Sequence, residues 1–180
     1  MKSSLCQFFL LLLHCNSKLQ HIYMQKGQTL FYIQAILAGI LIGLGDIVYV
    51  ATESHILGSF LFSLGLLSIL IKGYPLYTGR IGYVDGFKDL WNPRKGMLLI
   101  ILFNFIGIAI VCALANASRL DLSAVDAMVN TKCSQTWYST LFLSWGCGVM
   151  MYLAVNGWKK SQNPLTVIMP IMFFILCGFE

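Results

Sequence analysis

The amino-acid sequence predicts an all-α integral membrane protein, and composition is the first reason. Of its 180 residues, 58% are hydrophobic and only 11% are charged, and the mean hydropathy is +0.76. Soluble globular domains carry about 25% charged residues. The apolar residues also gather in long runs, and a helix of about 20 apolar residues spans the roughly 30 Å of bilayer hydrocarbon. Helices are therefore expected to cross a membrane.

Five spanning or half-spanning segments are expected, and together they predict one helical bundle. The apolar runs lie near Leu30–Val50, Ile56–Ile71, Met97–Ala117, Leu141–Trp158 and Leu165–Phe179. We assign residues 24–180 to a single transmembrane domain. Residues 1–23 form an N-terminal extension with two open interpretations. Either translation starts at Met24, or the extension is a helix that lies at the membrane interface.

The second apolar segment is interrupted by Gly73-Tyr-Pro-Leu-Tyr-Thr-Gly-Arg-Ile-Gly-Tyr83. Pro75 lacks an N–H donor and disfavours helix at Tyr74, while Gly73 and Gly79 add backbone freedom. Non-helical backbone at membrane depth is tolerated only where protein buries it or where it lines a wet cavity. The break is therefore expected to mark a site through which a solute passes.

Basic residues indicate the orientation of the chain rather than a nucleic-acid partner. The net charge is +5, but no basic stripe alternates with exposed aromatic residues. Lysine and arginine favour the cytoplasmic side of short connections. They gather before the first span, after the second and after the fourth (Lys18, Lys26, Arg80, Lys88, Arg94, Lys95, Lys159 and Lys160). We therefore expect a multi-pass protein of the cell inner membrane with a cytoplasmic N-terminus.

The chemistry-bearing residues form no recognisable catalytic or metal site. Six cysteines are present, without a CxxC pair. No HExxH motif, aspartate pair or Ser/His arrangement stands at membrane depth. An enzyme, a metal and a cofactor are therefore not expected. Lys72 ends a long apolar run, and both a pore position and a snorkelling position remain open for it.

Two pairs of segments resemble each other, which suggests two related halves. Gly39 and Gly43 in the first segment have the small-xxx-small spacing that lets helices approach closely in lipid. The fourth segment has a similar cluster at Gly146-Cys-Gly148. The second segment ends in Ile69-Leu-Ile-Lys-Gly73, and the fifth ends in Phe174-Ile-Leu-Cys-Gly178.

The second and fifth segments are expected to cross the membrane in opposite directions. Two halves of three helices each would then form an inverted repeat, with broken second and fifth helices that meet near the midplane. This arrangement predicts the second half of the fifth helix and a sixth span after Glu180, so the sequence is expected to be a fragment.

With these features in place, residues 24–180 resemble the formate/nitrite transporter family, which includes formate, nitrite and hydrosulfide channels. The resemblance rests on the order and spacing of several pieces. They are Phe62-Ser-Leu-Gly-Leu66, Gly73-Tyr-Pro-Leu-Tyr-Thr-Gly79 with its Leu-aromatic-Thr signature, Lys132 before the fourth helix, and Pro170 followed by Phe174-Ile-Leu-Cys-Gly-Phe-Glu180.

The resemblance implies an aquaporin-like homopentamer with one pore in each protomer. Leu76 and Thr78 would lie in the loop between the two halves of helix two. The Thr78 hydroxyl can donate a hydrogen bond to an anion or accept one from a neutral acid. The expected partners are a small anion and membrane lipid, and no nucleic acid.

Other site residues follow from the same resemblance. Phe62, Leu66 and Phe174 would form apolar constrictions that exclude hydrated ions. Lys132 would line the external vestibule, where an ammonium group concentrates small anions. Glu180 matches the acidic residue that precedes the central histidine of the family.

Two departures leave the substrate open. The central histidine of the family would be the next residue after Glu180, where this sequence stops. The position that is Asn in formate channels falls on Gly148. This second difference favours a hydrosulfide-like or otherwise divergent member of the family. The leading hypothesis is a channel for small monovalent anions of weak acids, namely formate, nitrite or hydrosulfide, that cross as the neutral acid or with a proton. The alternative is a non-conducting fragment or a structural membrane subunit.

Overall fold

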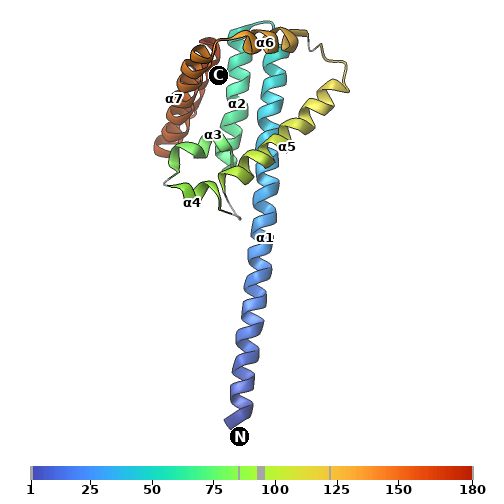
Figure 1. Cartoon of the computed structure of the whole chain (residues 1–180), viewed down its shortest axis with the longest axis vertical. Helices are drawn as coiled ribbons and strands as arrows, with labels where there is room; N and C mark the ends of the chain where they lie inside the picture. The colour runs from blue at the N-terminus through green and yellow to red at the C-terminus, as the bar shows by residue number, and fades with distance from the viewer. Residues whose placement is uncertain (1, 85, 93–95, 122, 180) are drawn as a thin grey trace.

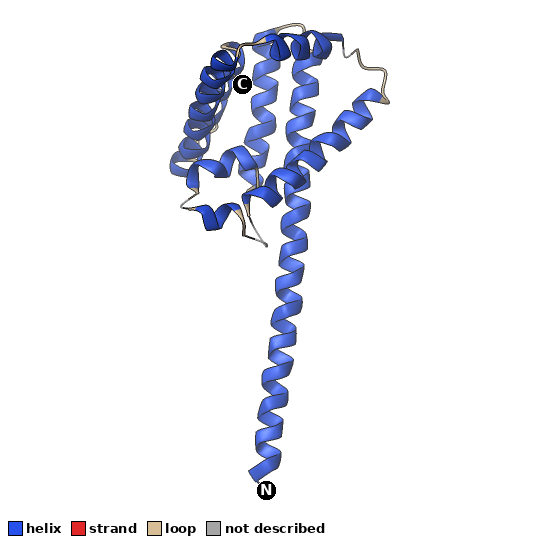
Figure 2. Cartoon of the chain, in the orientation of Figure 1, coloured by secondary structure: helices blue, strands red, loops and turns tan. Residues whose placement is uncertain are grey.

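The computed structural model describes residues 2–84, 86–92, 96–121 and 123–179, and every regular element in these ranges is a helix (Figures 1 and 2). Glu180, Arg94 and Lys95 lie outside the described residues. The elements follow in chain order: α1 (Lys2–Ala51), α2 (His55–Lys72), α3 (Tyr77–Arg80), the 3-10 helix η1 (Ile81–Tyr83), α4 (Phe87–Leu90), α5 (Met97–Asn116), α6 (Ser123–Ser134), α7 (Trp137–Ser161) and α8 (Leu165–Leu176).

Four helices of the described chain are long and apolar enough to cross a bilayer. They are the Gly27–Ala51 part of α1 together with α2, α5 and α7. Helix α8 is apolar but has only 12 residues, which amount to about 18 Å at the usual rise per residue. It therefore reaches about half-way through the hydrocarbon. The all-α membrane class predicted from composition is confirmed.

Helices α1 and α5 cross so closely that only glycine fits at the contact. A Cβ atom on Gly39 would overlap the carbonyl oxygen of Asn104, and one on Gly107 would overlap the carbonyl oxygen of Ile36. One turn along α1, Gly43 faces Val111. The close packing predicted from the glycine spacing of α1 is confirmed, and its partner is α5.

Helices α2 and α8 end in the same way. Gly73 and Gly178 both have a φ of +67°, in the left-handed region that glycine adopts at little cost. The residue after each glycine donates to the carbonyl five positions earlier, as in a Schellman motif. These bonds join Tyr74 N–H to Ile69 O at 3.1 Å and Phe179 N–H to Phe174 O at 2.9 Å. The resemblance between the two segments is thus a shared helix end.

Helices α2 and α8 pack against each other in the core. Leu66 and Ile69 of α2 and Val167 and Ile171 of α8 are fully buried, and Ala154 of α7 joins the same cluster. Helix α2 runs away from the end of the bundle that carries α6, whereas α8 runs back toward it (Figure 1). The antiparallel arrangement predicted for these helices is therefore present, with both breaks beside one core.

Two stretches outside the expected spans are partly helical. Most of α6 lies in the Ser118–Lys132 connection, and this helix begins where Asp121 Oδ1 accepts the Ser123 N–H at 3.0 Å. The break expected over Gly73–Tyr83 shrinks to residues 73–76, because Pro75 disfavours helix before it but not after it. Thr78 consequently lies in the first turn of α3 rather than in a loop.

Gly39→Ala is expected to lower the stability of the protein, because the added methyl group would overlap the α5 backbone. Overpacking of this kind costs about 1–3 kcal/mol. The measurement is the midpoint of unfolding in denaturing detergent. Gly27→Ala in the same helix is the control, since an added Cβ there meets nothing within 4 Å. Equal midpoints for the two variants would contradict the close crossing.

Candidate functional site

Three adjoining cavities lie in sequence between the two ends of the bundle. The outer cavity, of about 420 Å³, lies beside α6, and the inner cavity, of about 660 Å³, lies beside α3. A middle cavity of about 300 Å³ shares lining residues with both. Since α6 and α3 lie at opposite ends of the bundle (Figure 1), the three cavities trace a route along its length.

Most of the site residues predicted from the sequence meet at the middle cavity. Its lining surface is entirely apolar, although Thr78 is among the residues that line it. The predicted residues that line it are Phe62 and Leu66 of α2, Leu76 of the break, Thr78 of α3 and Phe174 of α8. The break after α2 and the half-length helix α8 thus bring distant parts of the chain to one place.

Two phenylalanine rings separate the outer cavity from the middle one. Phe62 and Phe174 line both cavities. Their ring centroids lie 6.2 Å apart and their planes are inclined by 73°, which is the edge-to-face geometry that aromatic pairs favour. The rings come from the two helices that share the core, so the core packing sets the distance between them.

The break itself separates the middle cavity from the inner one. Leu76 lines both cavities and is only 8% exposed. Its neighbour Pro75 is fully buried. The second half of the break, Pro75 and Leu76, is therefore buried in protein and lies beside a cavity, as non-helical backbone at membrane depth requires.

The outer cavity contains charges of both signs. Lys132 lies in the last turn of α6 and lines this cavity together with Asp46 of α1. The two charges attract each other across the cavity. An ammonium group at the mouth raises the local concentration of anions, and the carboxylate partly offsets this effect.

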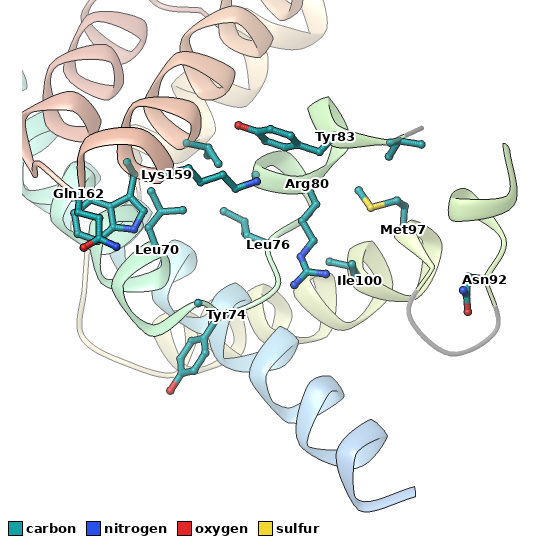
Figure 3. Close-up of a pocket in the computed structure, with 15 residues that line it drawn as sticks. Leu70, Tyr74, Leu76, Arg80, Tyr83, Asn92, Met97, Ile100, Lys159 and Gln162 are labelled. Atoms are coloured by element: carbon teal, nitrogen blue, oxygen red, sulfur yellow. The ribbon is translucent and has the colours of Figure 1, made fainter. Parts of the chain in front are cut away.

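Two cations line the inner cavity, namely Arg80 of α3 and Lys159 of α7, with Leu76 beside them (Figure 3). Aromatic rings hold both side chains. The Lys159 Nζ lies 3.3 Å from the ring centroid of Tyr83, and the Arg80 Cζ lies 5.5 Å from that of Phe31. Both ends of the route through the bundle therefore carry a positive charge.

Partial burial changes the proton affinity of the groups around the inner cavity. Desolvation lowers the pKa of the Arg80 guanidinium, which still remains protonated at neutral pH because its ordinary pKa is so high. Desolvation, and to a smaller extent the neighbouring Tyr152, raises the pKa of Tyr83. Its phenol therefore stays neutral beside Lys159.

Two polar residues of this region were not predicted from the sequence. Asp46 lies near the end of the first expected span, Leu30–Val50. Asn104 interrupts the apolar run of α5 and is only 5% exposed. The available signal was a lone amide inside an otherwise apolar span, since such residues seldom face lipid.

Gly148 lies apart from the three cavities, and Glu180 cannot be placed relative to them. Gly148 is not among the residues that line them, and a Cβ atom added to it meets nothing within 4 Å. The neighbouring Gly146, by contrast, packs against the ring of Phe179. Glu180 lies outside the described residues, so its role remains a prediction.

A family model described as formate/nitrite transporter matches residues 15–180, and the chain belongs to this family. The resemblance found in the sequence is thereby confirmed. Formate channel FocA of Haemophilus influenzae is 25% identical to this chain over 180 residues, covering 86% of the chain and 63% of that protein. Formate channel FocB of Escherichia coli K12 is 24% identical over 179 residues, covering 86% and 64%.

The chain thus spans 63% and 64% of the lengths of these two relatives. A solved structure described as a pentameric formate channel with formate bound matches with a TM-score of 0.74 at 24% identity. The match covers 87% of this chain and 71% of that one. It shows that the two chains share a fold.

Phe62→Ala is expected to open the way from the outer cavity to Cys147, which lines the middle cavity. In a chain whose other cysteines are replaced by serine, a charged thiol reagent applied from the α6 side should modify Cys147 faster in the variant. A chain with only Cys112, which is exposed on α5, is the control and should show no change. An unaltered Cys147 rate would show that the rings do not separate the cavities.

Proposed function

We propose that the protein is a channel for small monovalent anions of weak acids, with formate, nitrite and hydrosulfide as candidate substrates. One observation carries this proposal. A route through the bundle has a cationic side chain in the cavity at each end and apolar constrictions between them at Phe62, Phe174 and Leu76. Membership in the formate/nitrite transporter family and likeness to two formate channels support the same function.

The alternation of charge and apolar surface favours a weak acid as the solute. Moving an ion of carboxylate size into a medium of low dielectric constant costs on the order of 20 kcal/mol in the idealised case, whereas its neutral acid avoids most of this cost. The cations Lys132, Arg80 and Lys159 collect the anion at either end. The anion then takes up a proton, crosses the constrictions as the acid or together with that proton, and releases it on the far side.

The predicted residues that line the cavities have a place in this scheme. Leu66 and the constriction residues exclude water from the middle cavity. Thr78 also lines it, and rotation of its side chain would turn the hydroxyl toward the solute for a hydrogen bond. The scheme involves no covalent change in the solute, so no catalytic residue or cofactor is required. The assignment of Gly148 and Glu180 to the solute pathway rests on the family resemblance alone.

The arrangement in the membrane follows from the distribution of charge. We place the end of the bundle with α3 and α4 in the cytoplasm, because Arg80, Lys88 and Lys159 lie there. The N-terminus is then cytoplasmic and the membrane is the cell inner membrane. Residues 24–180 would act as one transmembrane domain preceded by the 1–23 extension. A homopentamer embedded in lipid would give one route in each protomer.

Transport into proteoliposomes tests the proposal. The protein is expressed from its complete reading frame, and uptake of formate, nitrite and hydrosulfide is measured at pH 5 and pH 7. Uptake of at least one is expected, with a higher rate at pH 5 because more of each solute is protonated there. Absence of flux for all three at both pH values would refute the channel and favour the structural membrane subunit.

Lys132→Gln is expected to lower the rate of anion uptake at low ionic strength, on the order of tenfold, because electrostatic attraction at the mouth is lost. The difference should shrink in high salt, which screens charges beyond about 10 Å at 0.1 M. Lys72→Gln is the matched control, since Lys72 is exposed at the end of α2 and lines none of the three cavities. A loss of the same size in both variants would argue against a special role for Lys132.

A further inference from the structure

The amide of Asn104 ties three segments of the chain together. Its Nδ2 donates to the carbonyl oxygen of Ala35 in α1 at 2.8 Å and to that of Pro75 in the break at 3.0 Å. Its Oδ1 accepts the N–H of Tyr77, the first residue of α3, at 2.9 Å. Leu76 is the single residue between the two backbone groups of the break that Asn104 holds.

The break creates the need for these bonds. In a continuous helix the carbonyl of Pro75 and the N–H of Tyr77 would belong to the regular ladder, but here α2 has ended and α3 is beginning. A polar backbone group left unpaired in an apolar medium is destabilising, and Pro75 and Asn104 are buried from water. One side chain from α5 satisfies both groups.

The anchor is rigid because of where Asn104 sits on α5. Its own carbonyl oxygen lies against Gly39, and Gly107, one turn further along α5, lies against the backbone of α1. The close crossing leaves no room for the two helices to slide and brings the amide within reach of Ala35. Asn104 therefore extends from a fixed two-helix unit to the break.

Asn104 acts on the solute only through other residues. A carboxamide has two N–H donors, and the carbonyl oxygens of Ala35 and Pro75 use both. To donate a hydrogen bond to an anion, the amide would have to break one of these two hydrogen bonds. What the amide does control is the position of Leu76, which separates the middle cavity from the inner one.

We infer that Asn104 is a positioning residue that sets the width of the inner constriction by clamping the backbone on both sides of Leu76. This inference rests on the route assigned under the proposed function. Asn104 also lines the middle cavity, but its two N–H donors already bind backbone carbonyls. The inference predicts that loss of the amide widens the constriction without removing a donor that is available to the solute. The channel should then discriminate less between formate and larger monocarboxylates.

The first test compares uptake of formate, acetate and propionate by the complete protein and by Asn104→Leu. The leucine side chain has the same branching and number of heavy atoms as asparagine but makes no hydrogen bonds. The ratio of propionate to formate uptake should rise on the order of tenfold, the equivalent of about 1.4 kcal/mol in relative barrier height. A merely structural role would lower the amount of folded channel and reduce all three rates by the same factor. Leu102→Ala, at an exposed site on the same helix, should leave the ratio unchanged.

A double variant shows whether Asn104 works through Leu76. Leu76→Ala alone should also raise the uptake ratio, because it removes the constricting side chain. If Asn104 acts by placing that side chain, Asn104→Leu in the Leu76→Ala background should add little further. Full multiplicative effects of the two substitutions would overturn the inference.

A second readout does not depend on transport. In a chain whose only cysteine is Cys147, a charged thiol reagent applied from the α3 side must pass Leu76 to reach the middle cavity. Asn104→Leu should speed this modification several-fold. An unchanged rate together with an unchanged uptake ratio would overturn the inference. Faster modification in a protein that transports none of the anions would uphold the clamp while refuting the proposed function.

Discussion

The fold depends on one constraint, which is that every backbone donor and acceptor at membrane depth must find a partner within the protein. Helices meet this constraint by themselves, but an interrupted helix does not. The chain uses two devices at its interruptions. At Gly73 and Gly178, left-handed caps let the N–H groups after each helix bind carbonyl oxygens of its last turns. The side chain of Asn104 then pairs the Pro75 carbonyl and the Tyr77 N–H, which the first cap does not reach. The cavities lie beside these interruptions because regular helix would have filled the space.

The same interruptions bring cavities that contain charged side chains close to apolar constrictions. Cationic side chains stand in the roomy outer and inner cavities, where water can reach them, and apolar side chains stand at the narrow points between them. The cations attract anions, while the narrow points reject charge. A solute that changes its charge by taking up one proton satisfies both demands in turn. Neither environment alone would select for weak acids over other small solutes.

Much of the fold and part of the site could be predicted from the sequence. Long apolar runs specify spans whatever their partners are, and Gly73 with Pro75 specifies the break through local sterics. Helix α6 was missed because a short helix of mixed polarity has no apolar run to reveal it. Asn104 was missed because its importance depends on a backbone crossing at Gly39, which brings together residues about 70 positions apart. Phe62 and Phe174 were suggested by family resemblance, since no local pattern predicts which phenylalanines of a membrane helix face one another.

The clamp around Leu76 holds main-chain atoms only. These hydrogen bonds therefore do not depend on which side chain stands at position 76. The backbone path of the constriction and the side chain that narrows it are set by different residues. A single substitution at position 76 can change the size of the opening while the backbone path, the caps and the helix crossing stay as they are. Such a division lets selectivity diverge quickly among related channels, because new substrates require no new fold. It also implies that position 104 should tolerate far less variation than position 76.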